Sequence, residues 1–308
     1  MRMRFVVFAL GGLYCSALFA QTVFDNQKID GYRGIWFTLG QYSKYGDKYS
    51  GGLGTYTAKH RPLAIYSAES NKTFFVYGGT TQRDEKRLLC MISYYAQTKD
   101  RGKTWTTIDG EKLKLPLTTI DCGARVVDYA KRRKNVYLKD LNFDRAGNPI
   151  CLYVTSDGHE PGPQNGPREW WVTRLINGEW TTRLVCSSDH NYDMGSLYVE
   201  RSRWVVIAPT AAGPQPHQSG GEVVRWVSED SGMSWERAKA ITRDSPRNHN
   251  YVRRPVSAQD PFYSFWADGD PAEFSESRLY FSNSDGSEVY QLPYNMNDAS
   301  EEPIRIIP

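Results

Sequence analysis

Two segments, TKDRGKTW at residues 98–105 and SEDSGMSW at residues 228–235, share one pattern, and this pattern indicates the fold. Both fit S/T-x-D-x-G-x-S/T-W. In this pattern the aspartate accepts hydrogen bonds from the amides of a turn, the glycine takes a positive φ, and the tryptophan packs beneath the turn. Such a turn joins two antiparallel strands, so the repeat predicts a chain built from repeated antiparallel units.

The sequence around both copies favours strands. Aromatic residues make up 13% of the chain, with nine Trp and twenty Tyr, and no stretch keeps a helical period. The predicted strands are residues 74–79, 88–95, 135–141, 150–155 and 204–208, with a hairpin at 170–185. Turn dipeptides lie between such runs at Gly147-Asn148, Asn177-Gly178 and Asp285-Gly286. We therefore predict an all-β fold.

The length predicts one toroidal domain over residues 21–308, a β-propeller of four-stranded antiparallel blades. A blade takes about 40 to 45 residues, and somewhat more with its loops, so the chain has room for roughly five or six blades. No segment has the length or composition of a linker between two domains.

The first twenty residues predict a secretory signal: Arg2 and Arg4 precede an apolar run, and small residues follow up to Ala20. A lipoprotein anchor at Cys15 is the alternative, but the bulky Tyr14 precedes that cysteine. No later run approaches about 20 apolar residues, so we expect no membrane span after cleavage. The prediction is secretion to the periplasm or the cell exterior.

The charge balance argues against nucleic acid as a partner. The chain has 38 Lys and Arg against 35 Asp and Glu, and the signal holds two of the arginines and no acid, so the remainder carries a net charge near +1. Cys90, Cys122, Cys151 and Cys186 contain no CxxC pair and are interpreted as buried thiols, with one disulfide left open.

Longer motifs carry a resemblance to a known family. They are GYRGIWFTLGQYSKYGDKYSGGLGTYTAKHRPLAIY at residues 31–66, KDLNFDRAGNPICLYVTSDGHEPGP at 139–163, SDHNYDMGSLYVE at 188–200, HNYVRRPVSAQDPFYSFWADGDP at 249–271 and YQLPYNM at 290–296. This set resembles the BNR-4 type of β-propeller, in which the repeated turn is called an Asp box. The family's relatives include polysaccharide lyases acting on rhamnose- and uronate-containing glycans such as ulvan, and α-L-rhamnosidases that remove rhamnose linked to glucuronate.

The chain departs from that pattern between its first blade and its first Asp box. Such relatives are seven-bladed, and two or three further blades are expected at this point, whereas LLCMISYY at residues 88–95 runs directly into the Asp box. The missing part includes His-bearing segments that resemble part of the lyase centre. We expect either a ring closed with fewer blades or an incomplete ring.

Two segments supply candidate catalytic residues. The resemblance to the rhamnosidases assigns catalysis to His60, whose imidazole titrates near neutral pH. The cluster DHNYD at residues 189–193 offers His190 and Tyr192, which would share one face if the segment were a strand. Sugar binding, metal binding and an acid/base pair are open for this cluster, and so is plain loop bracing. His159, His217, Asp140 and Glu160 are lesser candidates.

Two further segments supply candidate substrate-binding residues. HNYVRRP places His249, Tyr251 and Arg253 on one face if it is extended, and an arginine there would hold a uronate carboxylate. FWADGDP at residues 265–271 offers Trp266 as a stacking platform, with Asp268 and Asp270 as carboxylates, although the same letters are ordinary turn chemistry.

The sequence leaves the enzymatic activity open between two classes. The first is a secreted glycan-cleaving propeller without cofactor or metal, with rhamnosidase-like hydrolysis by His60 ahead of β-elimination at a uronate. The second is a non-catalytic glycan-binding propeller or a decayed paralogue. A sialidase ranks third, because its arginine triad and Tyr/Glu pair find no assigned positions.

Overall fold

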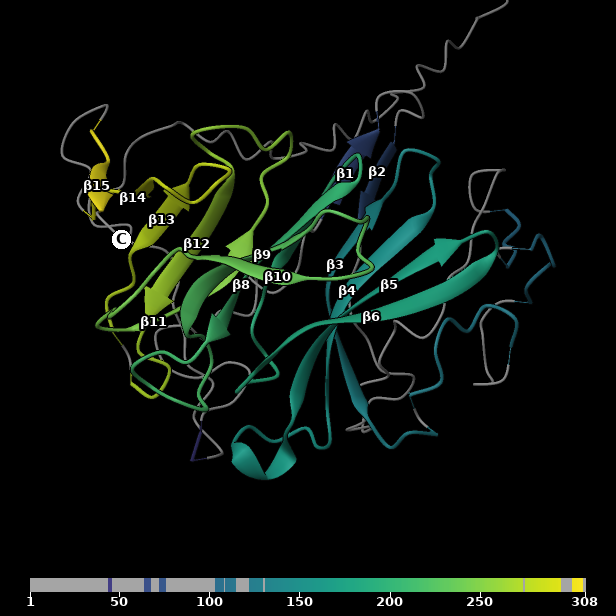
Figure 1. The fold of residues 1–308 in the computed structure, drawn as a ribbon, viewed down its shortest axis with the longest axis horizontal. Coiled ribbons are helices and arrows are strands. Elements are labelled where there is room, and N and C mark those ends of the chain that lie inside the picture. The colour runs from purple at the N-terminus through teal and green to yellow at the C-terminus, as the bar shows by residue number, and fades with distance from the viewer. Residues whose placement is uncertain are drawn as a thin grey trace, which may run out of the picture. The chain divides into compact units, whose positions relative to one another are not determined.

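The computed structural model describes residues 44–45, 64–67, 72–75, 103–107, 109–114, 122–129, 131–273, 275–294 and 301–306. Their elements are strands β1 to β15 and one short 3₁₀ helix, η3 (Pro163–Asn165), so the predicted all-β class is confirmed (Figure 1). The predicted signal, His60 and most of the first Asp box lie outside the described residues.

The first complete sheet holds four antiparallel strands in chain order. They are β3 (Asn135–Phe143), β4 (Pro149–Ser156), β5 (Arg168–Ile176) and β6 (Glu179–Ser188). Each predicted strand in this region and the predicted hairpin appear. The hairpin turns at Asn177 and Gly178, with φ of 52° and 84°, because a two-residue turn that matches strand twist needs positive φ at both positions.

Two more sheets follow with the same meander. The second contains β7 (Ser196–Glu200), β8 (Arg203–Ala211), β9 (Glu222–Ser228) and β10 (Glu236–Ala240). The third contains β11 (Asn248–Arg253), β12 (Ser264–Gly269), β13 (Leu279–Ser282), β14 (Val289–Gln291) and β15 (Ile304–Ile306). A separate hairpin pairs β1 (Ala64–Ser67) with β2 (Lys72–Phe75).

These sheets are the predicted four-stranded antiparallel blades, with β15 added at the edge of the third. The described residues contain three such sheets and one hairpin, so the total of five or six blades stays a prediction.

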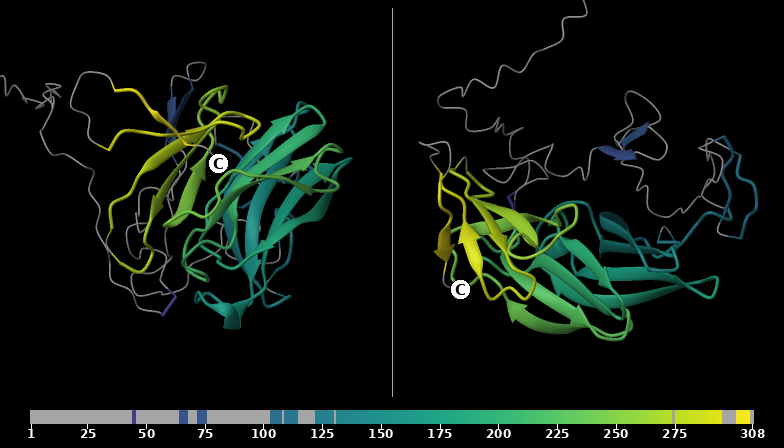
Figure 2. Two further views of the ribbon diagram at one scale, coloured as in Figure 1. Left: turned by 60° about the vertical axis from the view of Figure 1, so that its left-hand side comes forward. Right: turned by 90° about the horizontal axis from the view of Figure 1, so that it is seen from above.

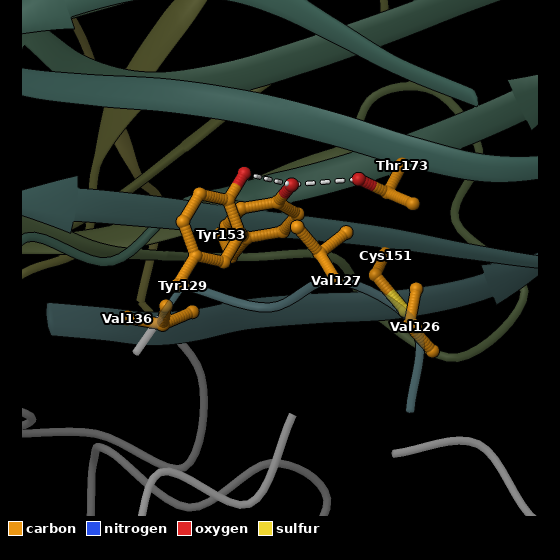
Figure 3. A pocket seen from close by; sticks show the side chains of 7 residues that line it. All are labelled: Val126, Val127, Tyr129, Val136, Cys151, Tyr153 and Thr173. Atoms are coloured by element: carbon orange, nitrogen blue, oxygen red, sulfur yellow. Dashed lines mark hydrogen bonds between the residues drawn. The ribbon is translucent and has the colours of Figure 1, made fainter. Parts of the chain in front are cut away.

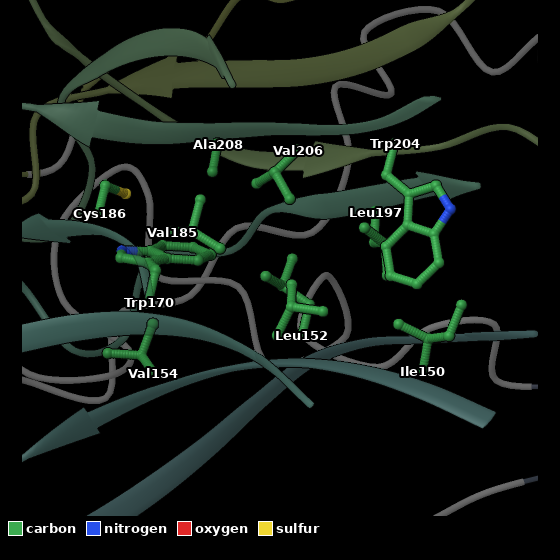
Figure 4. Packing of buried hydrophobic residues seen from close by; sticks show 11 residues of the cluster. Ile150, Leu152, Val154, Trp170, Val185, Cys186, Leu197, Trp204, Val206 and Ala208 are labelled. Atoms are coloured by element: carbon green, nitrogen blue, oxygen red, sulfur yellow. The ribbon is translucent and has the colours of Figure 1, made fainter. Parts of the chain in front are cut away.

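The core fills the spaces between successive sheets. Trp170 and Leu152 of the first sheet pack against Trp204 and Val206 of the second (Figure 4). Tyr198 of the second sheet packs in the same way against Trp266 of the third, and these two sheets lie side by side in Figure 2. Face-to-face burial therefore joins the three sheets.

The second Asp box forms the turn between β9 and β10. Asp230 accepts hydrogen bonds from the amides of Met233 and Ser234 and from the hydroxyls of Ser228 and Ser234, at 2.6 to 2.9 Å. Gly232 has φ +83°, and a Cβ there would lie 2.6 Å from the Trp204 ring. The aspartate is a turn brace, as its motif predicts.

Within the described ranges, no helix has the length and apolar character needed to cross a membrane.

Candidate functional site

Four of the connections at one end of the sheets form the candidate site, and they share that end because alternate turns of a meander lie on the same side. They join β4 to β5, β6 to β7, β8 to β9 and β10 to β11, whereas the Asp box at residues 228–235 lies at the other end. Hydrogen bonds link the connections directly. The Asn191 Nδ2 donates to the His159 carbonyl at 3.2 Å, and the His217 amide donates to Asp189 Oδ2 at 2.7 Å.

His190 is fully buried in the connection from β6 to β7. Its Nδ1 accepts the Tyr192 amide at 3.1 Å and lies 3.3 Å from Asp193 Oδ1. The segment turns between two sheets and forms no strand, so the expected alternation of faces does not hold, and His190 contacts both Tyr192 and Asp193. A buried imidazole in this position orients Tyr192 and does not itself reach a ligand.

Tyr192 is half-buried and lies where two connections meet. Its hydroxyl donates to the His159 carbonyl at 2.7 Å, and its ring meets the Tyr137 ring edge-on at 5.3 Å between centroids. The ring is thus fixed from both sides. Of the two predicted residues in this connection, Tyr192 is the one that a bound ligand can contact.

Two buried cations of the first sheet each bond to one of the connections that meet at Tyr192, and the sequence analysis did not single out either of them. Lys139 on β3 is 5% exposed and donates to the Asn191 carbonyl at 2.9 Å. Arg168 at the start of β5 is 2% exposed and donates to the Glu160 carbonyl at 3.1 Å. The available signal was positional: Lys139 opens the quoted motif at residues 139–163, and Arg168 directly precedes the predicted hairpin at 170–185.

Burying the charged Arg168 side chain costs free energy of folding. Its Nε has no hydrogen-bond partner among the described residues, and burial lowers the pKa of its guanidinium, opposed by Tyr137 and by the carboxylates of Asp189, Asp157 and Asp193. Arginine stays charged in proteins, so an arginine without a bonded carboxylate destabilises the fold unless something else retains it. An anionic ligand is one such reason.

The connections are held rigidly by buried amides and a carboxylate. Asp193 Oδ1 accepts the Gly220 amide at 2.7 Å, and Asn250 Oδ1 accepts the Met194 amide at 2.9 Å. Asn248 binds both ends of the β8 to β9 connection, through Gln215 and the Ser219 carbonyl. A fixed set of loops suits a site that must hold its groups in place.

His249 and Trp266 lie inside the third sheet. The Trp266 Nε1 donates to His249 Nδ1 at 3.1 Å, and His249 Nε2 bonds to the Ser245 hydroxyl at 2.9 Å. Both rings are at least 96% buried. They support the sheet in this conformation, and their substrate-binding role stays a prediction.

Asp268 belongs to the same interior. Its Oδ2 accepts the Tyr280 hydroxyl at 2.9 Å and its Oδ1 accepts the Arg278 amide. Asp270 follows as a turn residue that accepts the amides of Ala272 and Glu273. Asp268 thus stabilises the third sheet and Asp270 stabilises the turn that follows β12. Substrate binding by Asp268 likewise stays a prediction.

Tyr251 and Arg253 do not share the face of His249. Tyr251 has φ +60°, and the register with β12 shifts between Asn250 and Arg253. This bulge ends the alternation that an extended strand would keep. Tyr251 packs on Met194 beside the β6 to β7 connection, while His249 turns into the third sheet. Their roles, like that of His60, stay predictions.

A small pocket lies elsewhere, on the face of the first sheet. The Tyr129, Tyr153 and Thr173 hydroxyls form a chain there, with oxygens 2.7 and 2.6 Å apart (Figure 3). Its volume is about 10 Å³, the space of roughly one water molecule, so it cannot hold a sugar. The described residues contain no cluster of three metal-ligating side chains.

Three antiparallel sheets in succession and an Asp box at one of their turns are the blades that a β-propeller with BNR repeats is expected to have. Residues 63–188 match the family model BNR_4, described as a BNR repeat-containing family member. The predicted resemblance to BNR-4 propellers is thereby confirmed over that segment. Among curated proteins, none matches this chain.

Solved structures with similar folds include an ulvan lyase from a new polysaccharide lyase family. Its complex with -[GlcA(1-4)Rha3S]- is 16% identical, with a TM-score of 0.49 over 62% of this chain and 42% of that one. The form of that lyase without ligand is 17% identical, with a TM-score of 0.45 over 58% of this chain and 40% of the lyase chain. An α-L-arabinanase from Penicillium chrysogenum in complex with arabinobiose is 10% identical, with a TM-score of 0.32 over 69% of this chain and 72% of the arabinanase chain. The chain thus spans less than half the length of the ulvan lyase.

Proposed function

We propose that this protein is a secreted, carbohydrate-active propeller that binds and cleaves polysaccharide containing rhamnose and uronic acid. The observation that carries the proposal is the pair of buried cations, Arg168 and Lys139, each bonded to one of the two connections that meet at Tyr192. Two cations in a low-dielectric setting attract a carboxylate to the connections above them, since water screens their field weakly there. A uronate supplies that carboxylate, and the half-buried Tyr192 and Tyr45 supply ring faces for sugar contacts.

Hydrolysis of the bond between rhamnose and glucuronate is the first candidate reaction. It rests on the resemblance of the AKH segment to the rhamnosidase motif, with His60 as the proton-transferring group. The reaction uses positioned acid/base groups and needs no cofactor.

Elimination at the uronate is the second candidate, favoured by the described geometry. A cation near the uronate carboxylate acidifies the C5 proton. A tyrosine held by His190 and the His159 carbonyl is placed to exchange that proton. Tyr192 would then contact the substrate, and His190 would position it.

The test is mass spectrometry of a rhamnose-capped glucuronate oligosaccharide incubated with the purified protein. Hydrolysis gives product masses that sum to substrate plus one water, and elimination gives masses that sum to substrate alone. We expect Arg168→Met to weaken binding of the uronate oligosaccharide at least tenfold without changing binding of a neutral one.

The variants separate the two reactions. Loss of hydrolysis in His60→Ala supports the first candidate, and loss of the unsaturated product in Tyr192→Phe supports the second. Tyr129→Phe is the matched control, because it removes a hydroxyl from the face of the first sheet and leaves the connections intact. Unchanged substrate with tight binding would instead indicate a glycan-binding propeller, and absence of both would refute the proposal.

A further inference from the structure

Asp189 and His217 form a pair that the proposed function leaves unused. Asp189 follows β6, and His217 lies in the connection from β8 to β9. The His217 amide donates to Asp189 Oδ2 at 2.7 Å, and the His217 Nδ1 lies 4.0 Å from the same oxygen. The pair therefore joins two of the four connections at the candidate site.

The two oxygens of Asp189 differ in their surroundings. Oδ2 accepts a hydrogen bond from the His217 amide, whereas Oδ1 forms no hydrogen bond with any described residue. The Asp189 side chain is 20% exposed and that of His217 is 39% exposed. One oxygen is thus fixed by the backbone, and the carboxyl still reaches the surface where a ligand would lie.

The surroundings favour the protonated carboxyl. Burial raises the pKa of Asp189, and the neighbouring Asp193 carboxylate raises it further, against the opposing effects of the His217 amide and of the charges of His190, His217 and Arg168. A carboxyl that holds its proton to higher pH is suited to act as a general acid.

His217 is held in a strained conformation that keeps its amide on Asp189. It has φ +63°, which is uncommon for a residue with a side chain. Asn248 fixes the same connection through Gln215 and Ser219. The Tyr45 ring meets the imidazole edge-on at 5.9 Å between centroids. Strain that its surroundings maintain in this way is typical of functional loops.

We propose that Asp189 protonates the glycosidic oxygen of the bound polysaccharide, with His217 as its positioning residue; this rests on the proposed function. The carboxyl proton passes to the bridging oxygen as the carbon–oxygen bond breaks, and the bond's electron pair stays on that oxygen. In hydrolysis, water adds to the sugar carbon and its second proton restores Asp189. In elimination, the C5–H electron pair forms the new double bond, and the C5 proton passes to the base and then to Asp189.

The test compares Asp189→Asn with the wild-type protein on two substrates. One is the natural oligosaccharide, and the other carries 4-nitrophenol in place of the leaving sugar, a group that departs without protonation. We expect Asp189→Asn to lose about 10²-fold or more in kcat/KM on the first and to keep most of its activity on the second. Asp285→Asn, at the opposite end of the sheets, is the matched control.

The pH profile tests the role of His217. Because its imidazole lowers the pKa of Asp189, His217→Gln should move the alkaline limb of kcat/KM to higher pH. Equal losses on both substrates, or no loss on either, would overturn the role of Asp189 while leaving cleavage by the wild type intact. A wild-type protein that cleaves neither substrate would refute the proposed function and this proposal with it.

Discussion

At the scale of single residues, the direction of each hydrogen bond shows whether a polar side chain supports the fold or is able to act in catalysis. Ser245, His249 and Glu222 superficially resemble a nucleophile with its base. However, His249 Nδ1 accepts the Trp266 N–H, so its proton sits on Nε2 and is donated to Ser245. Ser245 in turn donates to Glu222 Oε2 at 2.9 Å. The serine cannot be deprotonated by this histidine, which makes the group a structural network.

This network predicts a loss of stability in acid. Burial lowers the pKa of His249 to about 4, from about 6.5 in the unfolded chain. Because the unfolded state binds the proton more readily, the stabilisation is complete above about pH 6.5 and is lost as the pH falls to 4. We expect roughly 3 kcal/mol less stability at pH 4 than at pH 7 from this group.

Urea unfolding at several pH values would measure the effect. His249→Gln keeps a polar group but cannot titrate, so its stability should change less than that of the wild type between pH 7 and pH 4. Parallel curves for the two proteins would show that His249 does not carry the effect.

At the scale of elements, the Asp box predicts a local loss of stability without loss of function. Asp230→Ala removes four hydrogen bonds from the turn between β9 and β10. We expect a loss of about 1 to 3 kcal/mol, since bonds to a charged acceptor are stronger than neutral ones. Glycan binding should be unchanged, because the turn and the candidate site lie at opposite ends of the sheets.

Thermal unfolding together with a glycan-binding assay would check this prediction. Asp285→Ala is the comparison, because Asp285 accepts hydrogen bonds chiefly from the one residue Ser287 in an ordinary turn and its loss should cost less. An Asp230→Ala protein that is stable but fails to bind would contradict the assignment of this aspartate to structure.

At the scale of the whole molecule, burial between sheets joins the three blades into one cooperative unit. Leu152 has no exposed surface and lies between the first and second sheets, whereas Leu141 on the same sheet is 45% exposed. Leu152→Ala should cost about 2 to 5 kcal/mol through lost burial and the cavity it leaves. Leu141→Ala should cost far less.

Denaturant unfolding followed by tryptophan fluorescence would measure both variants. A single transition shifted to lower denaturant is expected for Leu152→Ala. A new transition for part of the chain would instead mean that the sheets unfold independently, contrary to this account.

The local structure of this chain could be predicted from its sequence. Alternating β-branched and aromatic residues predicted β3 to β6 and β8, and Asn177-Gly178 predicted their hairpin, because strand and turn preferences act between near neighbours. The function of Asp230 as a brace followed from the motif for the same reason. The BNR-4 resemblance also came from linear motifs.

The composition of the candidate site was decided by the tertiary structure. Lys139 and Arg168 come from β3 and β5 and Tyr192 from the connection after β6, and hydrogen bonds between distant segments gather them at one end of the sheets. A left-handed residue at Tyr251 turned its neighbours to different faces, which no alternation rule foresees. Local preferences set the strands and turns, whereas contacts between distant residues form only when the sheets pack, and these contacts determine which polar groups meet.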